Sequence, residues 1–385
     1  MYSQRSTAVG SKHPRRLNPA VVIGWILFLA AVSIGQSSPA DFDRLAQQAS
    51  AARDQNDAVQ AIALYSQALQ LNPKWNDGWW FLGLLDYQQS RYIEGMDALS
   101  HYIEANPKAG PARAIRGLCE FETADYEQAL SDLETGLASG AADHSRNESI
   151  VRYHLAQLLT RLGRFSDALQ TYAYFAHDEN PSPEMLTGLG LAVLGVPLLP
   201  KEVSPEKTEV LLAAGRAAFP YLSGNIDAAR TAFQSFLQQF PSAPNAHYFC
   251  GYFLYPKDLE RALEEFKREL EISPSNGQAA LMAAWLLLMQ NDAAGALPYA
   301  KKAAELEPSS STAELVLGKA QLELDDTQQA MPHLEKALAG TPENLEVHLA
   351  LATAYSKLGR KDDAQRERLL CLQMAKADAR QLGRP

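Results

Sequence analysis

The sequence of 385 residues has few of the side chains on which metal proteins and many enzymes depend. Its three cysteines, Cys119, Cys250 and Cys371, form no CxxC pair and are odd in number, so we expect no disulfide and only core packing from them. The eight histidines are isolated, and no HExxH, GxSxG or Walker phosphate loop occurs. These absences predict a protein that is not an enzyme and needs neither a metal nor a cofactor.

Basic clusters are also scarce in the body of the chain. The sequence carries 35 Lys and Arg against 45 Asp and Glu, a formal charge of −10. Four of the basic residues and none of the acidic ones lie in the first 35 positions, so the remainder is more acidic still. Nucleic acid and anionic membrane surfaces both require clustered Lys and Arg. We therefore expect neither as a partner, and the 46% hydrophobic content predicts a folded body.

One long apolar run occurs, at Ala20–Gly35, between a basic stretch ending at Arg16 and a group of small residues. This three-part layout predicts an export segment over residues 1–40. Its sixteen apolar residues are long for a cleaved signal core and short for a membrane span of about 20. Two alternatives stay open, a cleaved signal peptide and a signal anchor that tethers the protein through residues 20–35. Both predict an exported body, either periplasmic or held outside the cytoplasm at the cytoplasmic membrane.

The prolines recur at a fixed period. Pro73 and Pro107 are 34 residues apart, as are Pro274, Pro308 and Pro342. This is the period of the tetratricopeptide repeat, which the chain resembles. The resemblance implies a unit of two antiparallel helices with small residues at positions 8, 20 and 27, large apolar residues at 4, 7, 11 and 24, and proline at 32, where it ends the second helix. The unit that ends at Pro342 fits best, and it contains Gly318, Ala330, Leu334 and Ala337. About nine such units fit between residues 42 and 378.

With this period and these residues, the chain resembles the tetratricopeptide-repeat (TPR) family. It is similar in particular to exported bacterial TPR proteins of unknown function, through segments such as PNAHYFCGYFL at 244–254. The resemblance implies an all-α fold, a right-handed superhelical solenoid of about nine helix-turn-helix units. It also implies a concave face, formed by the first helix of each unit, that binds peptide segments. It does not identify the ligand.

The period breaks most strongly at 181–207. An apolar helix is predicted near 184–194, and the prolines at 197, 200 and 205 exclude a continuous helix after it. We interpret this segment as a junction between an N-terminal array of about four units at 41–180 and a C-terminal array at 208–385, with about five units and a cap helix. A lid or hinge over the groove is the alternative.

Aromatic residues recur at the positions that point into the concave face in this family, which are 2, 5, 9 and 12 of the first helix. Aromatic rings offer large rigid contact areas with a polar edge. The alternative is that they pack between neighbouring repeats. The sixth unit has four such residues, three tyrosines and an asparagine. The candidate partner-binding residues are Trp80, Tyr87, Phe121, Tyr153, Tyr221, Asn245, Tyr248, Tyr252, Tyr255 and Trp285.

Together these patterns predict a non-enzymatic scaffold of the bacterial cell envelope that binds a peptide segment or protein partner in an aromatic groove. A membrane-tethered structural component of an assembly is a second hypothesis. A glycan-binding module is a third, because aromatic platforms also bind sugars.

Overall fold

The structure, a computed structural model, describes residues 39–141, 146–255 and 257–382, and within these ranges it contains helices and no strand. The all-α prediction is confirmed. The helices are α1 (Pro39–Asp54), α2 (Ala58–Leu71), α3 (Asn76–Gln88), α4 (Tyr92–Ala105), α5 (Gly110–Glu122), α6 (Tyr126–Gly136), α7 (Arg146–Arg161), α8 (Phe165–Tyr172), α9 (Pro183–Val193), α10 (Pro205–Leu222), α11 (Ile226–Gln239), α12 (Ala246–Leu254), α13 (Leu259–Ile272), α14 (Gly277–Met289), α15 (Ala293–Leu306), α16 (Ser311–Glu323), α17 (Thr327–Gly340), α18 (Leu345–Lys357) and α19 (Lys361–Leu382).

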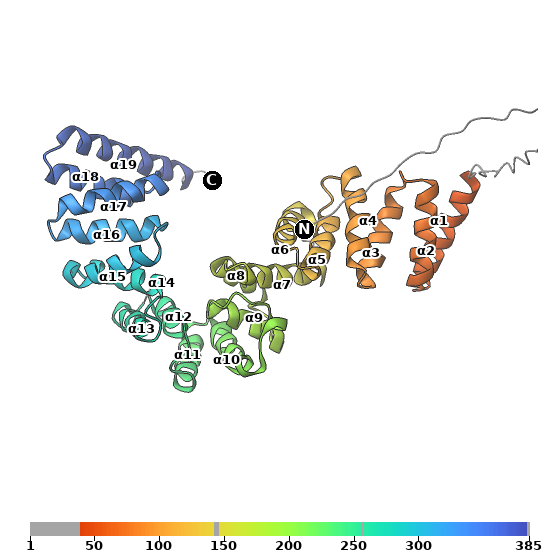
Figure 1. Ribbon diagram of the computed structural model, residues 1–385, viewed down its shortest axis with the longest axis horizontal. Coiled ribbons are helices and arrows are strands. Elements are labelled where there is room, and N and C mark those ends of the chain that lie inside the picture. The colour runs from red at the N-terminus through yellow and green to blue at the C-terminus, as the bar shows by residue number, and fades with distance from the viewer. Residues whose placement is uncertain (1–38, 142–145, 256, 383–385) are drawn as a thin grey trace, which may run out of the picture.

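The helices stack in chain order as a solenoid that turns at α9 and α10 (Figure 1). Each helix contacts its neighbours in sequence, and the pairs from α1 with α2 to α7 with α8 continue as α10 with α11 to α18 with α19. Over the residues that the structure describes these are nine helix pairs, as the period predicts, and α9 is an additional helix. The apolar run that predicts the export segment lies outside the described residues. Among the helices that are described, none is both long and apolar enough to cross a membrane.

Repeat position 24 supplies the core of most units. Leucine or an aromatic residue at this position is enclosed by both helices of its own unit and by the next unit. Seven of the largest fully buried side chains in the structure occupy it, namely Tyr65, Leu99, Leu133, Tyr172, Phe233, Phe266 and Leu334.

Position 8 faces position 24 across each helix pair and must therefore be small. A Cβ on Gly83 would lie 2.6 Å from the Leu99 side chain, and one on Gly318 would lie 2.6 Å from that of Leu334. Such distances are below any normal carbon–carbon contact, so glycine is what allows the two helices to approach. The register predicted from the sequence is confirmed by these contacts.

The helix predicted near 184–194 is α9, and it packs tightly against α10. A Cβ on Gly190 would lie 1.8 Å from the carbonyl oxygen of Leu211, and one on Gly215 would lie 1.8 Å from that of Leu186. The two backbones therefore touch directly. A single hydrophobic core runs from Ala114 to Ala320 through this segment, so the repeats on its two sides are packed together. The array boundaries at 180 and 208 stay a prediction.

The three cysteines are free and buried, which is consistent with core packing. Cys371 replaces alanine at position 27 of the last unit. Cys119 is buried on α5, where its sulfur lies 3.3 Å from the place of a Cβ on Gly95 of α4. Burial raises the pKa of Cys119 and of Cys250 to about 12, so both are thiols rather than reactive thiolates at neutral pH.

Candidate partner-binding groove

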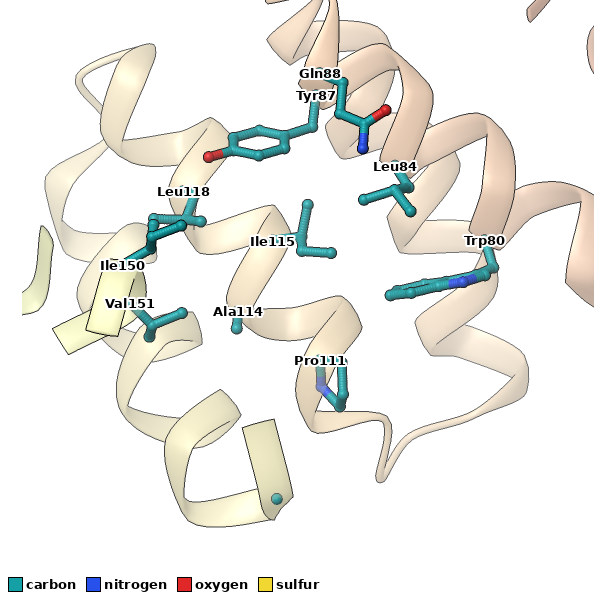
Figure 2. Close-up of a pocket in the computed structure, with 11 residues that line it drawn as sticks. Trp80, Leu84, Tyr87, Gln88, Pro111, Ala114, Ile115, Leu118, Ile150 and Val151 are labelled. Carbon is teal, nitrogen blue, oxygen red and sulfur yellow. The ribbon is translucent and has the colours of Figure 1, made fainter. Parts of the chain in front are cut away.

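A hollow of about 270 Å³ lies on the first helices of three consecutive units, α3, α5 and α7 (Figure 2). Its lining is almost entirely apolar, with Gln88 as the one amide side chain. It is lined by Trp80, Leu84, Tyr87, Gln88, Pro111, Ala114, Ile115, Leu118, Gly140, Ile150 and Val151.

The first wall of the hollow is formed by one face of α3. Trp80, Leu84 and Tyr87 are spaced by four and three residues, so they lie on one face of the helix. The ring of Trp80 packs at 5.5 Å from that of Tyr102, and the ring of Tyr87 at 6.3 Å from that of Tyr92. Both supporting rings belong to α4, the second helix of the same unit. The groove rings are therefore held in place before any ligand arrives.

The second wall of the hollow is formed by α5, whose side chains leave open the space beside the rings of α3. Ala114 is small, while Ile115 and Leu118 extend toward the hollow (Figure 2). Ile150 of α7 closes one side and is 37% exposed. An open apolar surface with two fixed aromatic rings suits an apolar side chain from a partner, because binding removes apolar area from water without ordering the groove.

The structure thus brings two of the sequence-predicted residues, Trp80 and Tyr87, into one site. The sequence prediction considered only aromatic residues. It therefore missed aliphatic neighbours of Trp80 and Tyr87 that occupy the same groove positions. Pro111 is at position 2 of its unit, and Leu84 and Leu118 are at position 9. Including every large apolar residue at positions 2, 5 and 9 would have found them.

Phe121 is a correction. It is 3% exposed and belongs to the core, with His154 at 5.0 Å in an edge-to-face arrangement. The Nζ of Lys201 lies 5.4 Å from the centre of its ring. Tyr153 is half-buried against Phe175, and burial raises its pKa to about 12. Phe121 thus packs between α5 and α7, and Tyr153 joins α7 to the turn that follows α8.

Asn245 is a second correction, because its side chain is committed to the fold. Its Nδ2 donates to the carbonyl of Leu194 at 2.6 Å, and its Oδ1 accepts from Asn276 at 2.8 Å. The residue has a φ of 65°, where the unit is one residue short. The fully buried carboxylate of Glu269 accepts from the backbone N–H groups of Asn245 and Tyr248 and so caps α12.

The other candidates of the C-terminal half form ring pairs. Tyr221 contacts Phe253 at 4.7 Å, and the indole N–H of Trp285 donates to the hydroxyl of Tyr255 at 3.3 Å. Tyr248 and Tyr252 lie 6.4 Å apart. None of these rings lines the apolar hollow on α3, α5 and α7.

A second hollow of about 460 Å³ lies between α16 and α18 and is lined partly by charged residues. Lys319 donates to Glu346 at 3.1 Å and lies 4.8 Å over the ring of Trp285. Leu349, on the same wall, is 49% exposed.

Two buried carboxyl groups lie on α3 and α5, the helices that carry most of the lining of the apolar hollow. Asp86 is 2% and Glu120 is 8% exposed. Burial raises the pKa of Asp86 to about 6, against the opposing charge of Arg91. Burial and the neighbouring Asp132 raise the pKa of Glu120 to about 7. The folded state therefore binds these two protons more tightly than the unfolded chain does.

This difference predicts a stability that depends on pH. Because both pKa values are raised on folding, the contribution of these groups is fully present below the ordinary carboxyl pKa and is lost as the pH rises through about 6 and 7. We expect Asp86→Asn combined with Glu120→Gln to raise the melting temperature at pH 8 by about 2–4 °C. The advantage should disappear near pH 4.5. Circular dichroism melts at both pH values check this.

Glu314 of α16 provides the matched control. It is 3% exposed, but hydrogen bonds from Lys336 and His333 outweigh its burial and lower its pKa. Its contribution is therefore present at neutral pH and is lost in acid. Glu314→Gln should lower the melting temperature at pH 8, and a gain there equal to that of the double variant would contradict the assignment.

Among the described residues, no three His, Cys, Asp or Glu side chains gather closely enough to hold a metal ion. The stacked helix pairs define the molecule as an α-solenoid repeat protein. A tetratricopeptide-repeat family model matches residues 47–110, 116–183, 223–276 and 252–311, and a second model of this repeat matches residues 322–367. These matches span more than half of the chain, which therefore belongs to the tetratricopeptide-repeat family, a class of protein-interaction scaffolds that are typically non-catalytic.

Several solved structures are similar over less than half of this chain. A MamA RS-1 double mutant is 18% identical with a TM-score of 0.41, covering 44% of this chain and 96% of that one. MamA from Desulfovibrio magneticus RS-1 is 20% identical with a TM-score of 0.39, covering 45% and 97%. YrrB, described as a TPR protein with an unusual peptide-binding site, is 17% identical with a TM-score of 0.40, covering 44% and 89%. No curated protein matches the chain.

Proposed function

We propose that this protein is a non-enzymatic scaffold that binds an apolar peptide segment of a protein partner in the groove of α3, α5 and α7. The observation that carries the proposal is the hollow itself, whose lining combines Trp80 and Tyr87 with aliphatic residues on the first helices of three units. A rigid aromatic anchor surrounded by aliphatic side chains is the usual composition of a binding hot spot. The overall acidity of the chain favours partners that are neutral or basic outside the anchor.

The test uses the purified full-length chain and a displayed library of random peptides. Selected peptides should be enriched in large apolar side chains. Trp80→Ala should weaken the binding of a selected peptide by about 2 kcal/mol, roughly thirtyfold, because it removes the largest ring of the groove. Isothermal titration calorimetry measures the change.

Ile93→Ala is the matched control. Ile93 is 70% exposed on α4, the second helix of the same unit, and does not line the groove. Its truncation should leave the affinity unchanged. Equal losses in Trp80→Ala and Ile93→Ala, or selected peptides without apolar enrichment, would overturn the proposed groove.

We further propose an exported location, in the periplasm or at the outer face of the cytoplasmic membrane. The support is the apolar run Ala20–Gly35 behind four basic residues. Mass spectrometry of the mature protein distinguishes the alternatives. A chain that starts near Gln36 or Asp41 indicates a cleaved signal. An intact N-terminus in the membrane fraction indicates a tether, and an intact soluble chain in the cytoplasm contradicts export.

A further inference from the structure

Four of the units share a hydrogen bond that links them to the unit before. The side chain at position 4 donates to the carbonyl of the residue six positions earlier, the proline at or near the end of the preceding unit. The donors and acceptors are Trp79 Nε1 to Pro73 at 2.9 Å, Arg113 Nη2 to Pro107 at 3.4 Å, His247 Nε2 to Pro241 at 3.2 Å and His348 Nε2 to Pro342 at 2.9 Å.

In three of these units an acidic residue on the second helix accepts from the same side chain. Arg113 reaches Asp132 at 3.4 Å, while the Nδ1 of His247 lies 2.5 Å from Glu265 and that of His348 lies 2.6 Å from Glu367. The three triads share one set of partners, in which a nitrogen side chain lies between a proline carbonyl and a carboxylate. Both contacts of Arg113 are longer, at 3.4 Å, and its carboxylate is also bonded by Arg116. The triads also differ in that arginine is always charged, whereas histidine is not.

Proton counting decides the state of the two histidines. A backbone carbonyl only accepts hydrogen bonds, and so does a carboxylate. A neutral imidazole has one N–H and can satisfy one of the two, whereas an imidazolium has two and satisfies both. His247 is 6% and His348 is 5% exposed, so water is largely kept from replacing the missing donor.

We propose that His247 and His348 are proton-dependent latches that hold consecutive repeats together in the C-terminal half of the solenoid. The imidazolium form joins the proline carbonyl of one unit to both helices of the next. Loss of one proton breaks a bond on one side of the ring. The first helix of the unit, which contributes to the concave face, is then held less firmly.

The charged groups around each ring favour the closed form. The ring of His247 faces the carboxylates of Glu265 and Glu269 on α13. Arg261 of the same helix lies near Cys250, and the charge of Glu265 also acts on that thiol. His348 faces Glu367 of α19. Burial acts to lower the pKa of each histidine, and the hydrogen bond and charge of its glutamate, together with the bond to the carbonyl, outweigh burial and raise it.

The direction of the effect follows. Because the pKa of each histidine is higher in the folded state than the ordinary value of 6.5, the stabilisation is fully present below pH 6.5 and is lost as the pH rises through the folded pKa. The latches are therefore closed below pH 6.5 and open as the pH rises through the folded pKa of each histidine.

The chain itself offers the matched variants, since its third unit carries arginine at the same position. His247→Arg and His348→Arg should each keep the triad but remove its dependence on pH. We expect hydrogen exchange in the full-length wild type, corrected for intrinsic rates, to show about a tenfold loss of protection in α12 and α18 between pH 6 and pH 8.5. His348→Arg should abolish the loss in α18 only, and His247→Arg that in α12 only.

Each variant thus controls for the other and for titrations elsewhere in the protein. His333→Gln is a further control, because His333 bonds one carboxylate and no proline carbonyl, and it should change neither loss. NMR titration of the ring protons should place His247 and His348 above pH 6.5. Ring pKa values below 6.5, or a protection loss that persists in both arginine variants, would overturn the latch. If an arginine variant fails to fold, Glu367→Gln should lower the NMR pKa of His348, and an unchanged pKa would equally contradict it.

Discussion

Gly190→Ala should destabilise the protein by roughly 3 kcal/mol or more, because the new methyl group has no space. Its carbon would lie 1.8 Å from the carbonyl oxygen of Leu211, which is a backbone atom and cannot rotate away. The whole of α9 must move from α10 to accommodate it. Urea unfolding followed by far-UV circular dichroism measures the loss, and a second transition is expected if the two halves uncouple.

Gly95→Ala is the appropriate comparison, since it makes the same change inside another helix. The nearest atom to its Cβ would be the sulfur of Cys119 at 3.3 Å, a tight contact that requires this side chain to shift by only a few tenths of an ångström. Alanine also favours helix over glycine by up to about 1 kcal/mol. Gly95→Ala should therefore cost much less stability than Gly190→Ala. Similar losses in both variants would show that α9 and α10 are not in the close contact described.

The register of the repeats could be predicted from the sequence because it rests on local alternation of small and large residues. Glycine at 83 and leucine at 99, or glycine at 318 and leucine at 334, are sixteen residues apart and meet across one helix pair. Most units repeat this spacing of a small and a large residue. A short-range pattern that recurs is sufficient to locate both helices and their contact faces.

The role of α9 and the position of the hollow were harder to predict. The prolines at 197, 200 and 205 indicate where helices break, but they do not show that Gly190 brings two backbones together. The hollow depends on the difference between neighbours, because Ala114 is small where Trp80 and Tyr87 are large. A list of aromatic residues contains no information on which of them has a small neighbour.

The sixth unit shows how an irregularity alters a predicted role. The unit is one residue short, so Asn245 adopts a left-handed conformation and its side chain bonds the end of α9. The buried Glu269 then caps α12 in the place where most units have a small or apolar residue. Counting positions from a regular repeat therefore assigns Asn245 wrongly to the groove. The tyrosines that follow it are again at the positions that the repeat predicts.

Tyr248→Ala and Tyr252→Ala should separate packing from contact in this unit. Tyr248 is half-buried, and its ring lies 5.8 Å from that of the fully buried Phe266. Burial raises the pKa of Tyr248 to about 12, which fits a hydroxyl largely removed from water. Its truncation should lower the free energy of unfolding by about 3 kcal/mol, as for other buried aromatic residues.

Tyr252, one helical turn away, is 47% exposed. It contacts Tyr248 and little else among the described rings, so its truncation should cost below about 0.5 kcal/mol. Thermal and urea unfolding of the two variants test the difference. A loss in Tyr252→Ala as large as that in Tyr248→Ala would mean that both rings are inter-repeat packing. A small loss of stability leaves Tyr252 as the residue of this unit that is free to contact a partner. If Tyr252→Ala then changes the peptide affinity without changing the stability, the binding surface extends beyond the groove of α3, α5 and α7.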